Sequence, residues 1–276
     1  MGIPFIPTPS GVDDWEKFEH DVRCCRGAAC FGAAAAHFGT TSPKTLEFRI
    51  DKKRYVTEYG ERTWTGTYSR WYLNGTKPSN ETAERVLERS GGAVRIAFWR
   101  DLPLWDLLAP KPPPIENLHH YLEAMPRQIR QILFKGSDES KARRPIHAPL
   151  ESADYLAIRN LKSLDAFICL LCLAAKGDLL DHDPSHLLPS LCAIDLLPHV
   201  IYRHAALQFR WERLFACLSR IFLERLYSGG AIFNHPVELV RDNLLAIRER
   251  RHSDLIVLSG TRQPRVPYQQ WINASA

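Results

Sequence analysis

A run of prolines near the middle of the chain most constrains how it can fold. Residues Ala109 to Pro114 read APKPPP. Consecutive prolines cannot continue a helix, because each lacks a backbone N–H, and they favour an extended spacer. We therefore predict one module over residues 1–109 and a second over residues 115–276, joined by a Pro-rich linker at residues 110–114.

The second module has the pattern of a helical bundle. FICLLCLAA (residues 167–175) and LFACLSRIFLERLY (residues 214–227) carry apolar residues on more than one face, which is typical of helices in a bundle core. We expect helices over residues 115–134, 152–175 and 237–251, and a long helical stretch over residues 187–227 that breaks near Pro198. The tail beyond residue 260 is expected to be an extended arm.

The first module also begins with a helix. Residues Val12 to Phe38 have helical apolar spacing and contain GAACFGAAAAHFG, whose small residues would let another helix pack closely. The following stretch, Leu46 to Thr57, is ambiguous between a helix and a short β-hairpin. The predicted fold class is therefore mainly α, with one short β-hairpin as an option.

The net charge of +5 is concentrated in one place. Between Thr41 and Arg100 the chain has 12 Lys and Arg against 7 Asp and Glu, whereas the remainder has 24 of each. Nine aromatic residues are interleaved with these charges. Such a composition suits a polyanionic partner. A solvated basic face over an aromatic core is the alternative interpretation.

Two short capped helices are predicted inside this basic stretch, which reads TYSRWYLNGTKPSNETAERVLERSGG from Thr67. Asn74 and Gly75 tolerate the left-handed conformation that ends a helix. Ser79 is a good N-cap for the next helix, with Glu81 in its first turn. Helical spacing predicts inward side chains on both helices: Tyr68, Trp71 and Tyr72 on the first, and Ala83, Val86 and Leu87 on the second.

The sequence S-R-W, then a glycine, then K-P-S at the start of the next helix resembles the Xre/Cro type helix-turn-helix family. Gly75 comes one residue later than in that family's pattern, and Tyr72 stands where an acidic residue is usual. The chain also resembles a loose class of bacterial proteins with a later L-W-x-L-L element, here Leu104 to Leu108. The first resemblance implies that the helix before Gly75 lies in the major groove of DNA, with Ser69 and Arg70 approaching it and Trp71 packed inward.

Arg70 is the candidate for reading a base, because its planar guanidinium can bind guanine with two hydrogen bonds. Five further basic residues suit phosphates: Lys52, Lys53, Arg54, Arg62 and Lys77. The alternative is that the same helical turn forms part of a protein-binding surface.

A second set of cations lies in the bundle. Arg203, Arg210, Arg213 and Arg220 follow one another at spacings of seven, three and seven residues, which would place them near one face of a continuous helix. We predict that this face binds an acidic partner or nucleic acid. A surface paired with Glu212 and Glu224 is the alternative.

Metal and catalytic motifs are weak. Asp181, His182, Asp183 and His186 offer ligands within six residues, but helix capping by Asp183 or Ser185 explains this stretch more simply. The seven cysteines have the pattern of reduced core residues, including the C-x-x-C pair Cys169 and Cys172. No nucleotide-binding, hydrolase or metalloprotease motif occurs, and no cofactor is expected.

We therefore predict a non-enzymatic bacterial DNA-binding or regulatory protein, cytoplasmic and without a membrane span, whose C-terminal helices bind a protein partner or a second copy. The alternative is a helical adaptor or scaffold subunit of a multi-protein bacterial complex, for example one of antiviral defence or of a mobile element. The two differ in salt dependence, because duplex binding weakens steeply as salt rises.

Overall fold

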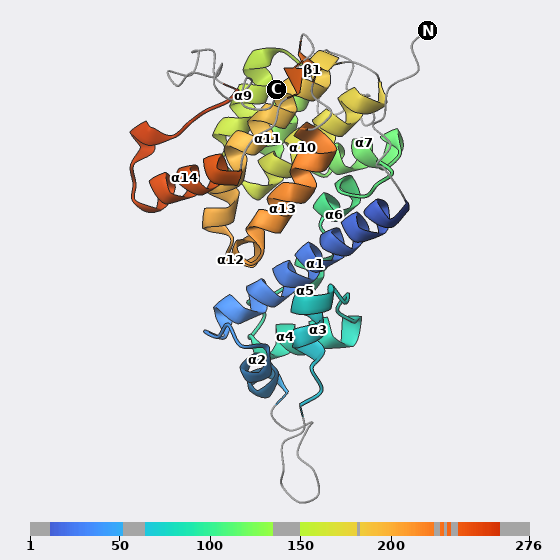
Figure 1. The fold of residues 1–276 in the computed structure, drawn as a ribbon, viewed down its shortest axis with the longest axis vertical. Helices are drawn as coiled ribbons and strands as arrows, with labels where there is room; N and C mark the ends of the chain where they lie inside the picture. Colours follow the sequence, from blue (N-terminus) through green and yellow to red (C-terminus); the bar gives the residue numbers. More distant parts are fainter. Residues whose placement is uncertain are drawn as a thin grey trace, which may run out of the picture. The chain divides into compact units, whose positions relative to one another are not determined.

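The computed structural model describes residues 12–51, 64–134, 150–180, 183–223, 227–228, 231–232 and 237–259. These residues are mainly helical, as the sequence predicts (Figure 1). Among them, strand pairing is confined to the antiparallel pair β1 (Tyr227–Ser228) and β2 (Ala231–Ile232). The hairpin considered for Leu46 to Thr57 is not formed as far as Ile50, which ends helix α2, and residues 52–57 lie outside the described part.

No helix in the described ranges combines the length and the apolar character that crossing a bilayer requires.

The chain folds into two compact units. The first, which we call the N-terminal unit, contains Pro9–Trp105 together with the returning segment Arg203–Cys217. The second, the C-terminal unit, contains the described residues of Asp106–Tyr202 and of the segment that begins at Leu218. The prolines at residues 110–114 follow the first unit in the sequence, as predicted. The prediction did not include the later segment Arg203–Cys217 in that unit.

The N-terminal unit is organised around one long helix, α1, which packs against α3, α5 and α12. Apolar side chains from five helices form its buried core, among them Phe31, Leu46, Trp71, Val86 and Ile96. Its helices are α1 (Val12–His37), α2 (Pro43–Ile50), α3 (Thr67–Asn74), α4 (Asn80–Arg89), α5 (Ile96–Arg100), α12 (Ala205–Gln208) and α13 (Trp211–Leu218), and α6 (Pro103–Leu107) follows at the boundary.

Local capping chemistry sets the helix ends in this unit. The Ser42 hydroxyl accepts a hydrogen bond from the Thr45 N–H at 3.3 Å at the start of α2. At the start of α4, Ser79 does the same for the Thr82 N–H at 3.2 Å. Each cap satisfies a backbone donor that has no partner within its helix. The predicted cap at Ser79 is thus confirmed.

The inward side of α4 is narrower than the sequence predicts. Ala83 and Val86 are buried, as expected, but Leu87 is 38% exposed. Leu87 follows Val86 directly, so it is rotated by about 100° away from the buried line of the helix.

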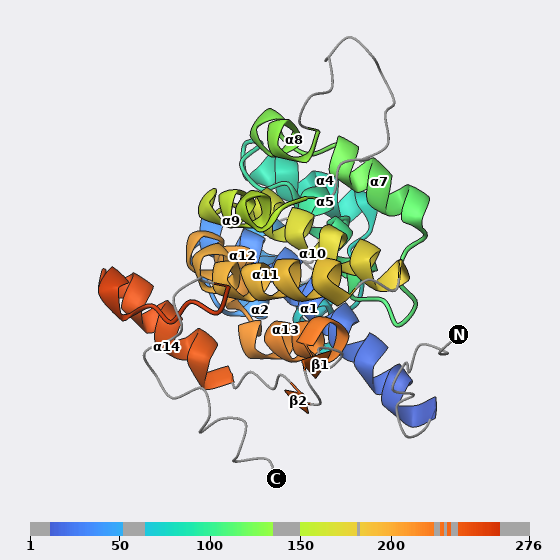
Figure 2. The ribbon, with the colours of Figure 1, turned by 90° about the horizontal axis from the view of Figure 1, so that it is seen from above.

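The C-terminal unit has the almost fully buried helix α10 at its centre, packed against α7 and α9. Figures 1 and 2 show α10 and α11 side by side. A Cβ atom at Gly177 would lie 2.5 Å from the carbonyl carbon of Ser185, so glycine permits this contact. The elements are α7 (Ile115–Glu123), α8 (Arg127–Leu133), α9 (Ser152–Asn160), α10 (Leu164–Leu179), α11 (Asp183–Arg203), the π-helix η1 (Ser219–Leu223), α14 (Val237–Arg248) and the 3-10 turn η2 (His252–Asp254).

Several predicted helix bounds are wrong in this unit. The helix expected over residues 115–134 is interrupted between α7 and α8 by Pro126, the N-cap of α8. The helix expected over residues 152–175 is interrupted before Ser163, the N-cap of α10. Pro198, the expected break, lies inside α11, where Leu197 and Val200 are buried. Their burial offsets the backbone hydrogen bond that proline removes. The chain leaves the helical path at His204 instead.

Candidate nucleic-acid interface

Helix α3 carries the candidate interface, and its buried side anchors it in the N-terminal unit. Tyr68 is fully buried and Trp71 is 2% exposed, with their ring centroids 4.7 Å apart. The predicted inward placement of Trp71 is therefore confirmed. The helix ends at Gly75, whose φ of 66° is left-handed and whose N–H donates to the Trp71 carbonyl at 3.2 Å.

Two glycines bring α3 against α1. A Cβ atom at Gly27 of α1 would lie 2.1 Å from the Trp71 carbonyl oxygen. At the end of α3, a Cβ atom at Gly75 would lie 2.4 Å from the backbone of Arg23. Helix backbones approach this closely only where side chains are absent. The small-residue run in α1 thus has the function that its composition indicates.

A buried polar network ties α3 to its neighbours α2 and α4. The Tyr68 hydroxyl donates to Asp51 Oδ2 at 3.2 Å, and Arg85 Nε lies 3.0 Å from Asp51 Oδ1. Burial is the main cause that raises the pKa of Tyr68, and the Asp51 carboxylate adds to it, so the phenol remains a proton donor at neutral pH. This network cannot be predicted from the sequence, because a buried acidic residue such as Asp51 has the same local sequence pattern as an acidic residue on the surface of a basic segment.

A second buried acid fixes the start of α3. Glu47 is fully buried, and its Oε1 accepts hydrogen bonds from the Thr65 N–H at 2.7 Å and from the Thr65 hydroxyl at 2.6 Å. The Thr65 carbonyl in turn accepts a hydrogen bond from Arg70 Nη1 at 3.2 Å. Glu47 thus fixes a backbone segment that also orients the Arg70 guanidinium.

The opposite side of α3 faces solvent. Arg70 and Asn74 are exposed, Leu73 is 52% exposed and Ser69 is half-buried. Arg70 Nη1 donates to the Thr65 carbonyl, and Arg70 Nη2 makes a longer hydrogen bond of 3.5 Å to the Thr67 hydroxyl. These contacts involve one edge of the guanidinium, so the group keeps N–H donors for another molecule. Of the two candidate base-contacting residues, Arg70 thus lies on the exposed face of α3 and Ser69 lies at its half-buried edge.

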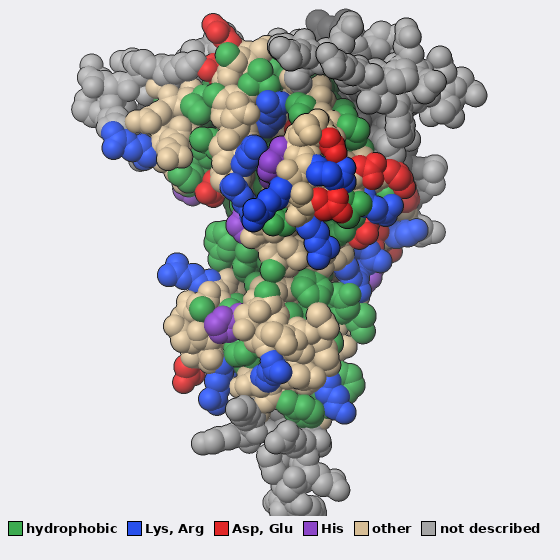
Figure 3. All heavy atoms as spheres, turned by 90° about the vertical axis from the view of Figure 1, so that its left-hand side faces the viewer, with side chains coloured by type: hydrophobic (Ala, Val, Ile, Leu, Met, Phe, Trp, Pro, Cys, Tyr) green, Lys and Arg blue, Asp and Glu red, His purple; other side chains and the backbone are tan. Residues whose placement is uncertain are grey.

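The predicted phosphate contacts are described only in part. Lys77 is exposed and lies 3.4 Å from the Asp101 carboxylate. The other four predicted residues, Lys52, Lys53, Arg54 and Arg62, lie outside the described residues. Figure 3 shows separate Lys and Arg side chains, rather than one continuous basic patch, on the visible face of the part that contains α2 to α4.

Arg100 holds the turn between α3 and α4. Its guanidinium donates to the Pro78 carbonyl at 3.2 Å, to Asn80 Oδ1 at 2.7 Å and to Asp101 Oδ2 at 2.7 Å. The hydrogen bond from Arg100 is the main cause that holds the pKa of Asp101 below its ordinary value, and Lys77 adds to it. The turn after Gly75 is therefore fixed by a charged pair that the chain supplies from α5.

The four arginines predicted to share one helix face do not do so. Arg203 ends α11, Arg210 lies in the turn before α13, Arg213 is in α13 and Arg220 is in η1. The chain changes direction at His204 and again at Phe209, so the seven-residue spacings do not follow one helix. Arg213 lies 3.4 Å from Asp21 of α1 rather than beside Glu212.

Arg210 makes a contact that the sequence did not indicate. Its guanidinium carbon lies 4.7 Å from the ring centroid of Tyr72 on α3. Such stacking of a guanidinium on an aromatic face is attractive and orients the cation. One of the four arginines therefore lies beside the candidate interface.

The described residues considered for metal binding do not form a metal site. His186 is buried, with Nδ1 3.0 Å from the Ala174 carbonyl and Nε2 3.1 Å from the Phe222 carbonyl. Asp181 and His182 lie outside the described residues, and Asp183 is the first residue of α11. Over the described ranges no group of three or more His, Cys, Asp or Glu side chains is placed to hold a metal ion.

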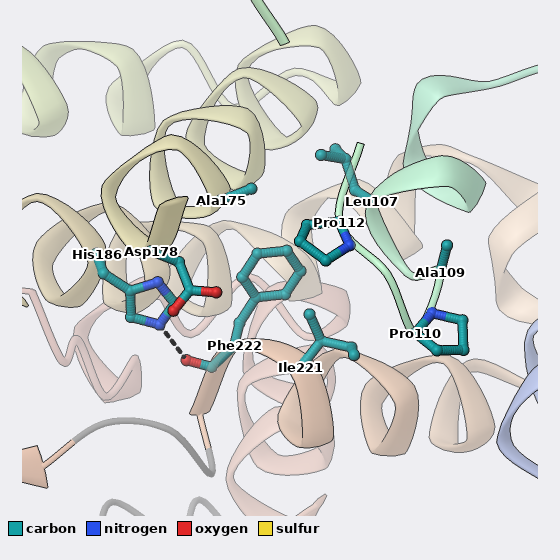
Figure 4. Close-up of a pocket in the computed structure, with 9 residues that line it drawn as sticks. All are labelled: Leu107, Ala109, Pro110, Pro112, Ala175, Asp178, His186, Ile221 and Phe222. Carbon is teal, nitrogen blue, oxygen red and sulfur yellow. Dashed lines mark hydrogen bonds between the residues drawn. The ribbon is translucent and has the colours of Figure 1, made fainter. Parts of the chain in front are cut away.

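The cavity beside His186 is small. It has a volume of about 10 Å³, room for about one water molecule, and Pro110 and Pro112 line it together with Phe222 (Figure 4). These prolines pack within the C-terminal unit. A cavity of this size does not bind a substrate.

All seven cysteines are buried and none forms a disulfide. Burial raises the pKa of Cys30 to about 12 and that of Cys192 to about 11. Thiols in this environment are poor nucleophiles and poor metal ligands, because the thiolate is the reactive form. The interpretation of the cysteines as core residues is confirmed, and the C-x-x-C pair is buried in α10 of the C-terminal unit.

A shallow groove lies between α4 and α5. It has a volume of about 500 Å³ and is lined by Leu87 and Phe98, which are 38% and 48% exposed, with Glu84 and Arg95 among its polar residues. Exposed apolar side chains around a groove are typical of protein-binding surfaces.

Comparisons with protein-family models, with curated proteins and with solved structures found no match for this chain.

Proposed function

We propose that this chain is a non-enzymatic DNA-binding protein that contacts duplex DNA through the exposed face of α3. One observation carries the proposal. Helix α3 buries Tyr68 and Trp71 on one side, while the other side presents Arg70 to solvent with the half-buried Ser69 beside it. A helix fixed in this way has the arrangement that major-groove recognition requires, because the base-contacting side chains must project from a rigid support.

The surroundings of Arg70 support a recognition role. Its guanidinium is oriented by a hydrogen bond to the Thr65 carbonyl. Thr65 is itself held in place because its N–H and its hydroxyl both donate to the Glu47 carboxylate. Orientation before binding lowers the conformational entropy that a long side chain loses on contact with a base. Arg70 also retains the donors for a two-hydrogen-bond contact with guanine.

The proposal is tested by measuring binding of the full chain to duplex DNA over a range of salt concentrations. A fluorescently labelled duplex of mixed sequence is the first probe, and selection from a random library then supplies preferred sequences. We expect the logarithm of the association constant to fall linearly with the logarithm of the salt concentration, by about 0.9 for each phosphate contacted. Absence of duplex binding at low salt would contradict the proposal.

The groove between α4 and α5 favours a second candidate, an adaptor that binds another protein. Its apolar lining by Leu87 and Phe98 is the specific observation for this function. An apolar contact depends little on salt, unlike a phosphate contact. Salt-tolerant binding of a second polypeptide that is lost in Phe98→Asp, together with no duplex binding, would favour the adaptor.

A further inference from the structure

Arg210 stands in an unusual backbone conformation. It lies in the turn between α12 and α13 with φ at 57°, in the left-handed region that side chains other than glycine rarely adopt. Its guanidinium carbon is 4.7 Å from the centroid of the Tyr72 ring. The turn therefore directs a cation from the returning segment onto α3, at the expense of some backbone strain.

The turn is anchored on both sides of Arg210. Phe209 packs edge-on against Phe31 of α1, with ring centroids 5.4 Å apart, and a Cβ atom at Gly32 would lie 2.6 Å from Phe209 Cδ2. On the other side, Arg213 pairs with Asp21 at 3.4 Å. These contacts fix the position of Arg210 relative to α1, and α1 is the helix on which α3 is seated.

The guanidinium of Arg210 keeps its donors. Within the described residues the guanidinium makes no hydrogen bond or ion pair, and it contacts the Tyr72 ring. Arg213, three residues later, already has the Asp21 carboxylate. The cation–π attraction that holds a guanidinium over an aromatic ring uses none of its N–H groups, so these donors stay available for another molecule.

The position of Tyr72 on α3 places this cation at the edge of the candidate interface. Ser69 and Tyr72 are three residues apart and therefore lie on the same side of the helix. Arg70 and Tyr72 are two residues apart, which corresponds to about 160° around a helix. Arg70 thus points away from the Arg210–Tyr72 pair, and the half-buried Ser69 lies between them around the helix, so the pair borders the exposed face of α3 at one edge.

We infer that Arg210 is a second nucleic-acid contact of this unit and binds a backbone phosphate of duplex DNA whose groove receives α3. The inference rests on the proposed function of α3. A planar guanidinium matches a phosphate with two parallel hydrogen bonds, and a phosphate beside the recognition helix fixes its register without reading sequence. The alternative is that Arg210 pairs with an acidic surface of another protein, and the test below includes that outcome.

Arg210→Gly is the informative variant, because glycine adopts a φ of 57° without strain. The variant should keep or raise the melting temperature of the full chain while it removes the guanidinium. Arg210→Lys keeps the charge but loses the planar fork and the stacking. Arg89→Ala, on the exposed end of α4, is the control for loss of one positive charge.

The probe is the full-length chain with a labelled duplex of mixed sequence, titrated at several salt concentrations. We expect Arg210→Gly to bind about five- to tenfold more weakly at about 0.1 M salt and to reduce the salt slope by about 0.9. Arg210→Lys should recover the slope more than the affinity. Arg89→Ala should change both less than Arg210→Gly does.

The outcomes separate the two proposals. If the parent binds the duplex and Arg210→Gly binds equally well, or no worse than Arg89→Ala, the phosphate contact is wrong and the function proposed for α3 remains. If the parent does not bind any duplex at low salt, the proposed function fails and the inference fails with it. Loss of an acidic protein partner in Arg210→Gly, with duplex binding unchanged, assigns the cation to protein instead.

Discussion

Gly27 of α1 lies directly against the backbone carbonyl of Trp71 on α3. A Cβ atom at Gly27 would come within 2.1 Å of that oxygen, far inside the contact distance of the two atoms. Backbone on both sides leaves no flexible side chain to move away. The position of α3 therefore depends on a glycine in a helix, where glycine is otherwise unfavourable by about 1 kcal/mol.

Gly27→Ala should destabilise the protein although alanine favours helices. The added methyl group forces α1 and α3 apart, and overpacking of this kind costs about 1–3 kcal/mol. Chemical denaturation of parent and variant measures the difference. Ala36→Ser, an exposed change on the same helix, is the control and should stay within about 0.5 kcal/mol of the parent. A Gly27→Ala variant as stable as the parent would show that α3 is not seated as described.

Tyr68→Phe removes the hydroxyl that donates to the buried Asp51 carboxylate. We expect a loss of about 1–3 kcal/mol in the free energy of unfolding, because a buried charged acceptor loses a donor. Tyr121→Phe is the matched control, since its hydroxyl donates to Asp106 at 2.6 Å in an exposed position. Equal losses of unfolding free energy in the two variants would mean that burial does not strengthen the hydrogen bond between Tyr68 and Asp51.

The lowered pKa of Asp101 should make the stability of the protein depend on pH. Its pKa in the folded protein lies below its ordinary value, chiefly because of the hydrogen bond from Arg100. Its contribution is therefore fully present at pH values above the unfolded-state pKa of about 4 and is lost as the pH falls through the folded-state value. Unfolding free energies of parent and Asp101→Asn should differ at neutral pH and converge on acidification. A difference that is unchanged at about pH 2 contradicts this assignment.

The cysteines should be unreactive in the folded protein. All seven are buried, and burial raises the pKa of the Cys172 thiol, among others, above its ordinary value. We expect a thiol reagent such as DTNB to label the native chain slowly and all seven cysteines rapidly once denaturant unfolds it. Rapid labelling of the native protein at neutral pH would place at least one thiol at the surface.

The sequence predicts the region from α3 to α4 well because its signals are local. Gly75 ends α3 in the left-handed conformation that Asn-Gly permits, and Ser79 caps α4. Trp71 points inward because it lies one helical turn from Tyr68. Each of these features depends on residues within one or two turns of one another.

Other features depend on residues far apart and leave no local pattern. Glu47 is buried because Thr65, beyond a stretch outside the described residues, supplies two donors. Arg210 contacts Tyr72 because Arg203–Cys217 returns to α1. The periodicity of arginines in that segment predicts a single helix face, but the turns at His204 and Phe209 remove it. Tertiary packing, rather than helix propensity, decides these positions.

Trp71 should affect DNA binding only through the stability of the fold, because its side chain is buried. Trp71→Ala should lose about 3–5 kcal/mol of stability, as expected for a buried aromatic side chain that is truncated in a core. Binding to DNA should fall with the folded fraction and recover under stabilising conditions. A Trp71→Ala variant with parental stability would contradict the burial on which the two-sided character of α3 rests.

The binding of Arg70→Ala to duplexes selected by the parent tests the central claim most directly. Arg70 is exposed, so the melting temperature should match that of the parent within the effect of about 0.5 kcal/mol typical of surface changes. Affinity for the selected duplex should fall by about 1–3 kcal/mol and preference at one base pair should relax, whereas Lys77→Ala should weaken all duplexes alike and lower the salt slope by about 1. Unchanged affinity and sequence preference in a folded Arg70→Ala protein would contradict the proposal that α3 reads DNA.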